Sequence, residues 1–313
     1  MLRYTLKRLI STLPTLIAVL TVIFVIIRIA PGDPAIAILG DNASQQAIDA
    51  LRERLGLNEP LLEQYWFFLT DALTGNLGNS LVSGRSVLHE VLEVLPHTLD
   101  LTVAAIFVGV ILGIPVGILA AVYRNGPVDY IARISSLLGL SFPSFYTAIL
   151  LILAFAIHFP WFPVISNANL SDPGDRLYNL VLPALSLGLI MVAYVARTTR
   201  ASMIEALGAD YIRTARAKGA PALVIVARHG FRNAIIPIIT VIGLYLGLLI
   251  GNSVITEIVF NRPGLGKLIV GALEQRDYTM LQGLMVIYAF FIVLTNLVTD
   301  LAYGMSDPRV KYQ

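Results

Sequence analysis

The chain has 313 residues, of which 57% are hydrophobic and 13% charged, with a formal net charge of +2. Its mean hydropathy is +0.77, which excludes an ordinary soluble domain and is typical of an integral membrane protein. The chain contains no cysteine, and this excludes disulfides, thiolate metal sites and cysteine nucleophiles.

Six stretches lack aspartate, glutamate, lysine and arginine for about the length that a helix needs to cross ~30 Å of hydrocarbon. They are residues 9–27, 101–123, 134–171, 177–196, 233–256 and 278–299. The third is long enough for one span plus an apolar loop, because HFPWFP at 158–163 breaks the helix and supplies interfacial aromatic rings. We predict an all-α integral membrane protein with six transmembrane helices.

The first stretch resembles a signal peptide, because it follows Arg3, Lys7 and Arg8. Its apolar core is too long for one, and no cleavage site of small residues follows, so we expect a retained helix. In the segment after it, residues 44–57 predict an amphipathic helix capped by Ser44 and stopped by Gly56, and residues 60–73 predict a second helix. This segment has too few apolar residues for a core of its own, so it predicts a small extracytoplasmic cap.

The predicted division is therefore an N-terminal part at 1–96, with one transmembrane helix and the cap, and a five-helix transmembrane domain at 97–313. Two spans of the second part carry glycines four residues apart, which let helix backbones approach closely in lipid. They are Gly109, Gly113 and Gly117, and then Gly243, Gly247 and Gly251. Packing within the chain and an interface with another subunit both remain open for these rows.

Lysine and arginine are unevenly distributed among the connecting segments. Fourteen lie in the N-terminus, the 124–133 loop, the 197–232 loop and the C-terminus, which alternate to one side of the membrane. Seven lie in the segments on the other side, and Arg28 stands at a membrane edge. The positive-inside rule thus places both termini and the 197–232 loop in the cytoplasm, and residues 31–96 outside.

Several kinds of chemistry have no motif in this chain. The only Gly-Lys pair, Gly266-Lys267, is followed by Leu268, so the phosphate loop of an ATPase is missing. There is no H-E-x-x-H metal motif, and we expect no catalytic residue, no cofactor, no metal site and no nucleic-acid partner. The spans contain almost no ionisable group, whereas transporters that work alone on a proton gradient usually have one near the bilayer midplane. We therefore favour a membrane protein that takes its energy from a separate protein. The alternative prediction is a proton-coupled transporter acting alone.

The 197–232 loop contains a compact basic segment, YIRTARAKG at 211–219. Helix-forming residues from Asp210 to Lys218 followed by Gly219 predict a short helix on the membrane surface. One interpretation is a basic helix that binds anionic lipid headgroups. The other is a contact for a partner protein, because RHGFRN at 228–233 leads directly into the fifth span and would transmit a force to it.

Over essentially its whole length the sequence resembles the permease subunits of binding-protein-dependent ABC importers, in the dipeptide and oligopeptide permease family. The resemblance rests on DYIRTARAKG at 210–219, APGDP at 30–34, GNLGNS at 75–80, FNRPGLGKL at 260–268, RDYTMLQG at 276–283 and SDPRVKY at 306–312. The sequence departs from the pattern at Arg213-Thr214-Ala215, where the wider importer class prefers Glu-Ala-Ala, and at Arg262, where an aromatic residue is common. The second departure suggests no change in function.

The resemblance implies the type I importer fold and a coupling helix that docks on an ATPase. The implied coupling residues are Tyr211, Arg213, Thr214, Ala215, Arg216, Lys218, Gly219, His229 and Asn233. It also implies a bacterial inner membrane location and four kinds of partner: a second permease subunit, two ATP-binding subunits, an extracytoplasmic solute-binding protein and membrane lipid. ATP hydrolysis would belong to the partners, so this chain is not expected to be an enzyme.

Uncharged polar residues in the last two spans suit a pathway through which a solute passes without being held. These residues are Asn252, Ser253, Thr256 and Asn296. Hydrogen bonding between helices explains the same residue types equally well. Peptides lead as substrates, while glutathione, nickel chelates, opines and oligosaccharides remain open because specificity in such systems lies mostly in the receptor.

Overall fold

The computed structural model describes residues 2–29, 34–40, 43–54, 56–166 and 172–306. These residues are almost entirely helical, with one isolated β-bridge between Asn79 and Ser86. Most of the APGDP stretch and all but the first residue of SDPRVKY lie outside them.

Five helices in the described part are long and apolar enough to cross a membrane. They are α1 (Leu2–Ile29), α5 (Val87–Val122), α8 (Pro173–Gly208), α11 (Arg232–Val259), which the preceding short elements extend, and α13 (Tyr278–Ser306). A sixth span is formed if α6 (Pro127–Ser141) and α7 (Ser144–Ile152) count as one. The predicted all-α membrane fold is confirmed.

The third predicted span differs from the expected single helix plus loop. Helix α7 continues as a π-helical turn, η1 (Leu153–His158), and the two halves of the pair meet at 103°. Pro143 stands between them and disfavours a helical conformation for Phe142, whose φ of −93° and ψ of 127° are extended. The break therefore lies at Phe142 and Pro143, well before HFPWFP, where the helix ends again.

The chain divides into two compact units, which we describe separately. Unit 1 consists of Met1–Thr5, His97–Pro263 and Thr295–Gln313, and unit 2 consists of Leu6–Pro96 and Gly264–Leu294. The second segment of unit 2 comes from late in the sequence, which the pattern of spans does not indicate. The functional division into residues 1–96 and 97–313 stays a prediction.

Unit 2 contains most of α1, the cap helices and the first part of α13. Its short helices are α2 (Pro34–Leu39), α3 (Gln45–Arg54), α4 (Leu61–Thr74) and α12 (Leu265–Glu274). Helices α3 and α4 confirm the two predicted helices of the cap, and the Ser44 hydroxyl accepts a hydrogen bond from the Ala47 N–H at 3.3 Å. The core joins α1, α4 and α13 through Leu16, Leu20, Phe68, Ala72, Val286, Ala289 and Val293.

Two of the stretches that carry the family resemblance meet in unit 2. The Ser80 hydroxyl, at the end of GNLGNS, donates to the carboxylate of Asp277 in RDYTMLQG. The other oxygen of Asp277 accepts from the Met280 N–H at 3.0 Å, at the start of α13. A Cβ on Gly283 would lie 2.6 Å from the Val87 side chain, so this position of α13 has no room for one. These contacts hold the two stretches together within unit 2.

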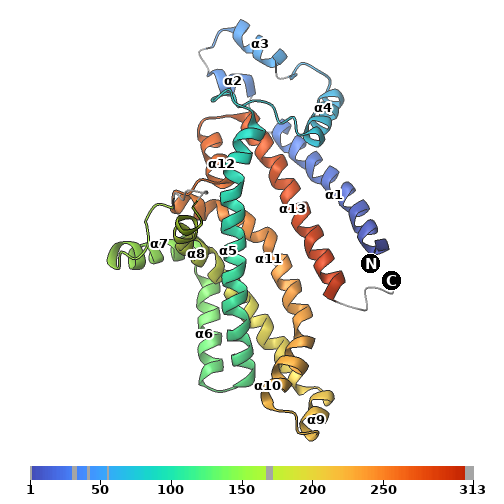
Figure 1. The fold of residues 1–313 in the computed structure, drawn as a ribbon. Helices are drawn as coiled ribbons and strands as arrows, with labels where there is room; N and C mark the ends of the chain where they lie inside the picture. The colour runs from blue at the N-terminus through green and yellow to red at the C-terminus, as the bar shows by residue number, and fades with distance from the viewer. Residues whose placement is uncertain (1, 30–33, 41–42, 55, 167–171, 307–313) are drawn as a thin grey trace. The chain divides into compact units, whose positions relative to one another are not determined.

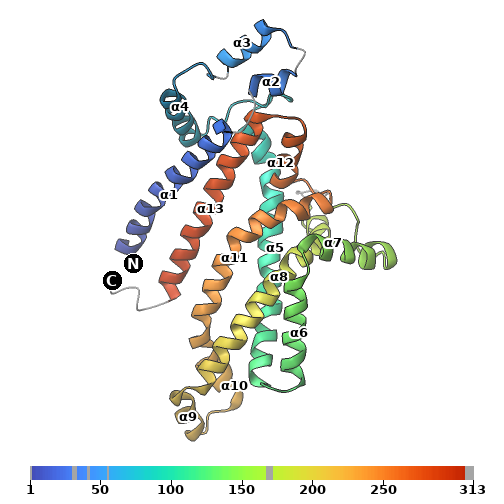
Figure 2. The ribbon, with the colours of Figure 1, turned by 180° about the vertical axis from the view of Figure 1, so that it is seen from behind.

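Unit 1 is built around α8, which is its most buried helix. Leu187, Met191 and Val195 of α8 pack in one core cluster with Leu101 of α5 and Ile238 of α11. Helix α6 runs along α8, and α7 turns away from α6 (Figure 1). Figure 2 shows the same helices from behind, with α8 and α11 converging at the end that carries α9 (Asp210–Ala217).

The structure distinguishes the two glycine rows. Gly109, Gly113 and Gly117 of α5 lie against Met191, Val195 and Thr199 of α8, and a Cβ at any of them would approach those side chains to 2.8 Å or less. The first row is therefore packing within the chain. In the second row Gly243 lies against Thr299, while no described atom lies within 4 Å of a Cβ built on Gly247 or Gly251.

Candidate functional site

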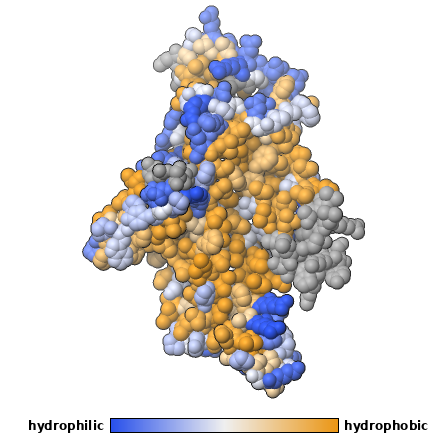
Figure 3. Space-filling view, in the orientation of Figure 1, coloured by the Kyte–Doolittle hydropathy of each residue, from blue (hydrophilic) through white to orange (hydrophobic). Residues whose placement is uncertain are grey.

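The predicted short helix exists as α9, at the end of unit 1 where α8 ends and the chain turns back towards α11. Ala209 has extended backbone angles, φ −73° and ψ 154°, and separates α8 from α9. Hydrophilic side chains gather at this end of unit 1, while hydrophobic residues cover its middle (Figure 3). The sequence-based prediction of a helix from Asp210 is confirmed.

The end of α9 is a Schellman motif. The Ala220 N–H donates to the Ala215 carbonyl at 3.1 Å, and the Gly219 N–H donates to the Arg216 carbonyl at 2.9 Å. Gly219 has a φ of +76°, in the left-handed region that costs a residue with a Cβ about 1 kcal/mol or more. The predicted glycine stop is confirmed, and its cause is the backbone conformation rather than lack of space, since no described atom lies within 4 Å of a Cβ built there.

A single apolar side chain anchors α9. Ile212 is 1% exposed, whereas Tyr211, Arg213, Thr214, Arg216 and Lys218 are exposed and Ala215 is half-buried. Arg213 forms an exposed ion pair with Asp210 at 3.5 Å. Helix α9 therefore presents an outward surface with three positive charges and one tyrosine ring.

The segment after α9 connects it to the fifth span. It consists of α10 (Ala222–Val224) and a π-helical turn, η2 (Ile225–Phe231), which runs without a break into α11. A Cβ on Gly230 of η2 would lie 3.1 Å from both Met203 and Leu207 of α8, so the turn packs closely on that helix. The Asn233 side chain donates to the His229 carbonyl at 2.7 Å, across the junction of η2 and α11.

This arrangement brings all nine predicted coupling residues to one end of unit 1, in two groups. Seven lie on or next to α9, His229 lies in η2, and Asn233 lies at the start of α11. Apolar side chains from α8, η2 and α11 form one continuous cluster beneath them, including Met203, Val226, Phe231 and Ala234. This cluster joins α8, η2 and α11, and the transmission of a movement of α9 to these spans stays a prediction.

The four predicted pathway residues have different surroundings. Ser253 and Thr256 are buried in unit 1, and the Ser253 hydroxyl donates to the Ile250 carbonyl of its own helix at 2.8 Å. Asn252 is exposed and lines a cavity of about 170 Å³ between α8 and α11, and Asn296 is exposed on α13. In the same cavity the rings of Tyr194 and Tyr245 lie with their centroids 3.9 Å apart. The assignment of these residues to a pathway stays a prediction.

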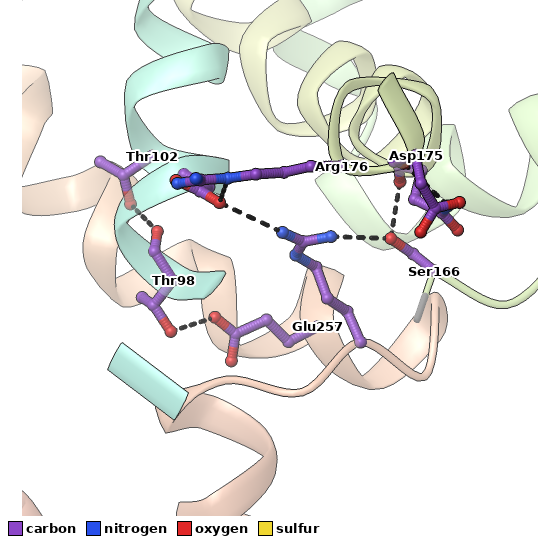
Figure 4. Close-up of polar contacts among 9 residues, drawn as sticks. Thr98, Thr102, Ser166, Asp175, Arg176 and Glu257 are labelled. Atoms are coloured by element: carbon purple, nitrogen blue, oxygen red, sulfur yellow. Dashed lines mark hydrogen bonds and ion pairs between the residues drawn. The ribbon is translucent and has the colours of Figure 1, made fainter. Parts of the chain in front are cut away.

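A cluster of charged and polar residues lies at the opposite end of unit 1, around the start of α8 and the end of α11 (Figure 4). We call it the buried polar cluster, and it consists of Thr98, Asp100, Thr102, Ser166, Asp175, Arg176, Asn179, Glu257 and Arg262. Arg176 binds both carboxylate oxygens of Asp100, and Thr98 donates to Glu257 at 2.6 Å. These contacts connect α5, α8 and α11.

Arg262 is the centre of this cluster and is fully buried. Its guanidinium donates to the Ser166 hydroxyl at 2.9 Å and lies 3.9 Å from the Asp100 carboxylate. Burial lowers the pKa of the Arg262 guanidinium, while Asp100 and Glu257 act in the opposite direction. Sequence reasoning treated Arg262 as a departure without consequence. The available signal was the presence of Asp100, Arg176, Glu257 and Arg262 at the ends of spans in a chain with few charges.

Comparison with known proteins agrees with this geometry. Residues 1–102 match the N-terminal model for membrane components of binding-protein-dependent transport systems, and residues 113–312 match the model for their inner membrane component. The chain is 40% identical to the glutathione transport system permease protein GsiC of Escherichia coli strain K12 and 41% identical to that of Pectobacterium atrosepticum. Both alignments cover all 313 residues and the whole of each relative.

The fold also matches a solved structure, the MetNI methionine ABC transporter in inward-facing conformations. The TM-score is 0.55 at 19% identity, and the match covers 69% of this chain and 96% of that one. This likeness concerns the fold alone. Together with the two family models, it confirms the resemblance, and the chain belongs to the family of inner membrane components of binding-protein-dependent transport systems.

Proposed function

We propose that this chain forms, with a second permease subunit, the membrane pathway of an ATP-driven importer for short peptides or similar small solutes. Two separate ATP-binding subunits would contact α9, and an extracytoplasmic solute-binding protein would deliver the substrate. The observation that carries this proposal is the construction of α9. The helix is exposed on its outward face, held by Ile212 alone, and connected through η2 to α11.

We infer a protein partner for α9, rather than a lipid surface, from the side chains that it exposes. Ala215 offers little bulk next to the exposed ring of Tyr211, which suits close packing against another protein. The Tyr211 side chain is 42% exposed, so part of its surface is covered by its own chain. Because no phosphate-loop motif occurs in the sequence, ATP hydrolysis is assigned to the partners.

The substrate we propose is a tripeptide such as glutathione, or a dipeptide of similar size. The relatives that are 40–41% identical over the full length are named as permeases of a glutathione transport system. Asn252 and the tyrosines beside it would line the pathway, with Ser253, Thr256 and Asn296 as further candidates. Uncharged hydroxyl and amide groups can exchange hydrogen bonds with a peptide without holding it tightly.

The proposed location is the bacterial inner membrane, with both termini and α9 in the cytoplasm. The family description and the apolar spans support the membrane, and the distribution of lysine and arginine supports the orientation. In this orientation the cap helices α2, α3 and α4 face the solute-binding protein.

Reconstitution into vesicles tests the proposal. This chain is incorporated together with its candidate second permease and ATP-binding subunits. The candidate solute-binding protein and labelled glutathione or dipeptides are then added. We expect uptake that requires ATP and every partner. Vesicles with this chain alone and an imposed proton gradient serve as the comparison. Uptake by this chain alone would show that it is a proton-coupled transporter and would overturn the proposal.

A further inference from the structure

A cavity of about 310 Å³ lies in unit 1 where α5, α6 and α8 meet, near the turn that joins α5 to α6. Its walls combine apolar side chains with three arginines. The apolar residues include Val116, Leu137 and Leu140, and the arginines are Arg133 of α6 and Arg197 and Arg200 of α8. No acidic residue lines it.

One of the three arginines is neutralised within the chain. Arg200 binds both carboxylate oxygens of Asp129, which is fully buried. One of these oxygens also accepts from the Asn125 N–H at 2.9 Å, so the carboxylate accepts three hydrogen bonds. Asp129 therefore links the α5–α6 turn to α8, and it also attracts Arg133 without forming a close ion pair with it.

Three arginines and one neighbouring carboxylate, Asp129, leave the surroundings of the cavity with an excess of positive charge. Arg133 and Arg197 are both exposed, and neither forms an ion pair with a residue in the described ranges. The Arg133 guanidinium lies over the Tyr130 ring, 5.7 Å from its centroid. The lining thus carries a net positive charge next to an apolar interior, and this combination fits an anion with an apolar body.

The outer surface of α6 identifies the environment of the cavity. Ile131, Ile134 and Leu138 are more than half exposed, and so is Leu137 at the cavity wall. Exposed apolar residues of this kind suit contact with lipid, and an acyl chain lying along α6 would lead into the cavity. In the proposed orientation the three arginines stand at the cytoplasmic ends of their spans, at the level of lipid phosphates.

We propose that this cavity binds an anionic phospholipid, with Arg133 and Arg197 holding the phosphate and the apolar wall accommodating the start of an acyl chain. The inference rests on the proposed orientation but does not require transport. The site is distinct from the outward surface of α9. It lies beside Arg200, about two to three turns before the end of α8, so the bound lipid would stabilise the junction of α5, α6 and α8.

Lipid binding to the purified full chain in nanodiscs provides the test. The nanodiscs consist of phosphatidylcholine with a small fraction of phosphatidylglycerol. They hold the wild type, the double variant Arg133→Gln/Arg197→Gln or the variant Arg124→Gln. Native mass spectrometry counts the lipid bound to each protein. Arg124 is an exposed arginine in the same turn that does not line the cavity, which makes it a matched control. The double variant should bind phosphatidylglycerol about 25-fold more weakly, since each arginine near an anionic headgroup contributes about fivefold. Arg124→Gln should stay within about twofold of the wild type.

A variant that keeps every charge distinguishes binding in the cavity from a general attraction of lipid to the positive surface. Ser136→Trp fills the cavity from α6 and should also reduce phosphatidylglycerol binding, while eluting as the wild type does. Inorganic phosphate and glycerol phosphate in detergent should not displace the lipid at millimolar concentrations. Equal losses in Arg124→Gln and the double variant would show a general surface attraction, and displacement by phosphate alone would show a site for a free anion. Unchanged binding in the double variant would also overturn the proposal.

Discussion

At the scale of single residues, Asp100 and Arg262 make contacts that the sequence pattern does not predict. Asp100 binds Arg176 through both oxygens and lies near Arg262, which has no exposed surface. The three residues are far apart in the sequence, and nothing in local composition indicates that they meet. Their positions at the ends of spans were visible, but their mutual contacts depend on how α5, α8 and the end of α11 pack.

Replacing Asp100 by Asn should destabilise the protein by about 3–5 kcal/mol, because it leaves the buried Arg262 and the adjacent Arg176 without their shared carboxylate. The further change Arg262→Met should recover part of that loss by removing the uncompensated buried charge. Unfolding by denaturant in detergent measures both, as a double-mutant cycle.

The matched control is Asp49→Asn, which removes an exposed carboxylate paired with Arg52 at 3.2 Å. It should cost less than about 1 kcal/mol. If Asp49→Asn costs as much as Asp100→Asn, or if Arg262→Met adds to the loss, then charge compensation is not what Asp100 provides.

At the scale of elements, the sequence predicts those features that depend on neighbouring residues. Helix α9 and its end at Gly219, and helices α3 and α4, all follow from caps, stops and apolar spacing, and the structure confirms them. The bend between α6 and α7 was not predicted, although Pro143 is a local signal for it. The apolar run continues across this proline, so hydropathy alone gives one long stretch.

The coupling role of α9 stays a prediction, and Gly219 offers a graded test of it. Gly219→Leu should weaken co-purification with the ATP-binding subunits, because a left-handed backbone costs a residue with a Cβ about 1–2 kcal/mol and would redirect the end of α9. Gly219→Asn should lose much less, since asparagine tolerates this conformation. Both side chains have space, so a steric clash does not complicate the comparison.

The triple variant Arg213→Gln/Arg216→Gln/Lys218→Gln separates protein docking from lipid binding. It removes the basic charge but keeps the shape of α9, and ATPase association should largely survive. Full association of Gly219→Leu together with loss in the triple variant would instead assign α9 to the lipid surface.

At the scale of the whole molecule, the all-helical membrane fold and the family could be predicted, because both depend on long runs and on motifs spread over the chain. The composition of the two units could not. The segment Gly264–Leu294 joins Leu6–Pro96 through side chains such as Leu20 and Val286, and a pairing between such distant segments leaves no periodic signal. The pathway remains a prediction for a similar reason, since a second permease subunit would have to form part of it.

The proposed orientation can be measured directly, because the natural chain has no cysteine. Single cysteines at Pro60 and Arg216, both exposed, are probed in intact cells with a thiol reagent that does not cross membranes. Residue 60 should be labelled from outside, and residue 216 only after the membrane is opened. Leu187→Cys, at a fully buried position of α8, serves as the unlabelled control. Labelling of residue 216 in intact cells would reverse the orientation.

The two-segment construction of unit 2 has a consequence for how the protein is made. Ribosomes synthesise α1 and the cap first, and the residues that complete their core, Val286, Ala289 and Val293, emerge only near the end of translation. During that interval α1 is held in the bilayer by its own hydrophobicity, since little of it is buried by other residues even in the finished chain. A nascent chain released before residue 294 should therefore insert its early helices yet leave the cap open to protease. Completion of the cap is thus expected to depend on α13, the last helix to leave the ribosome.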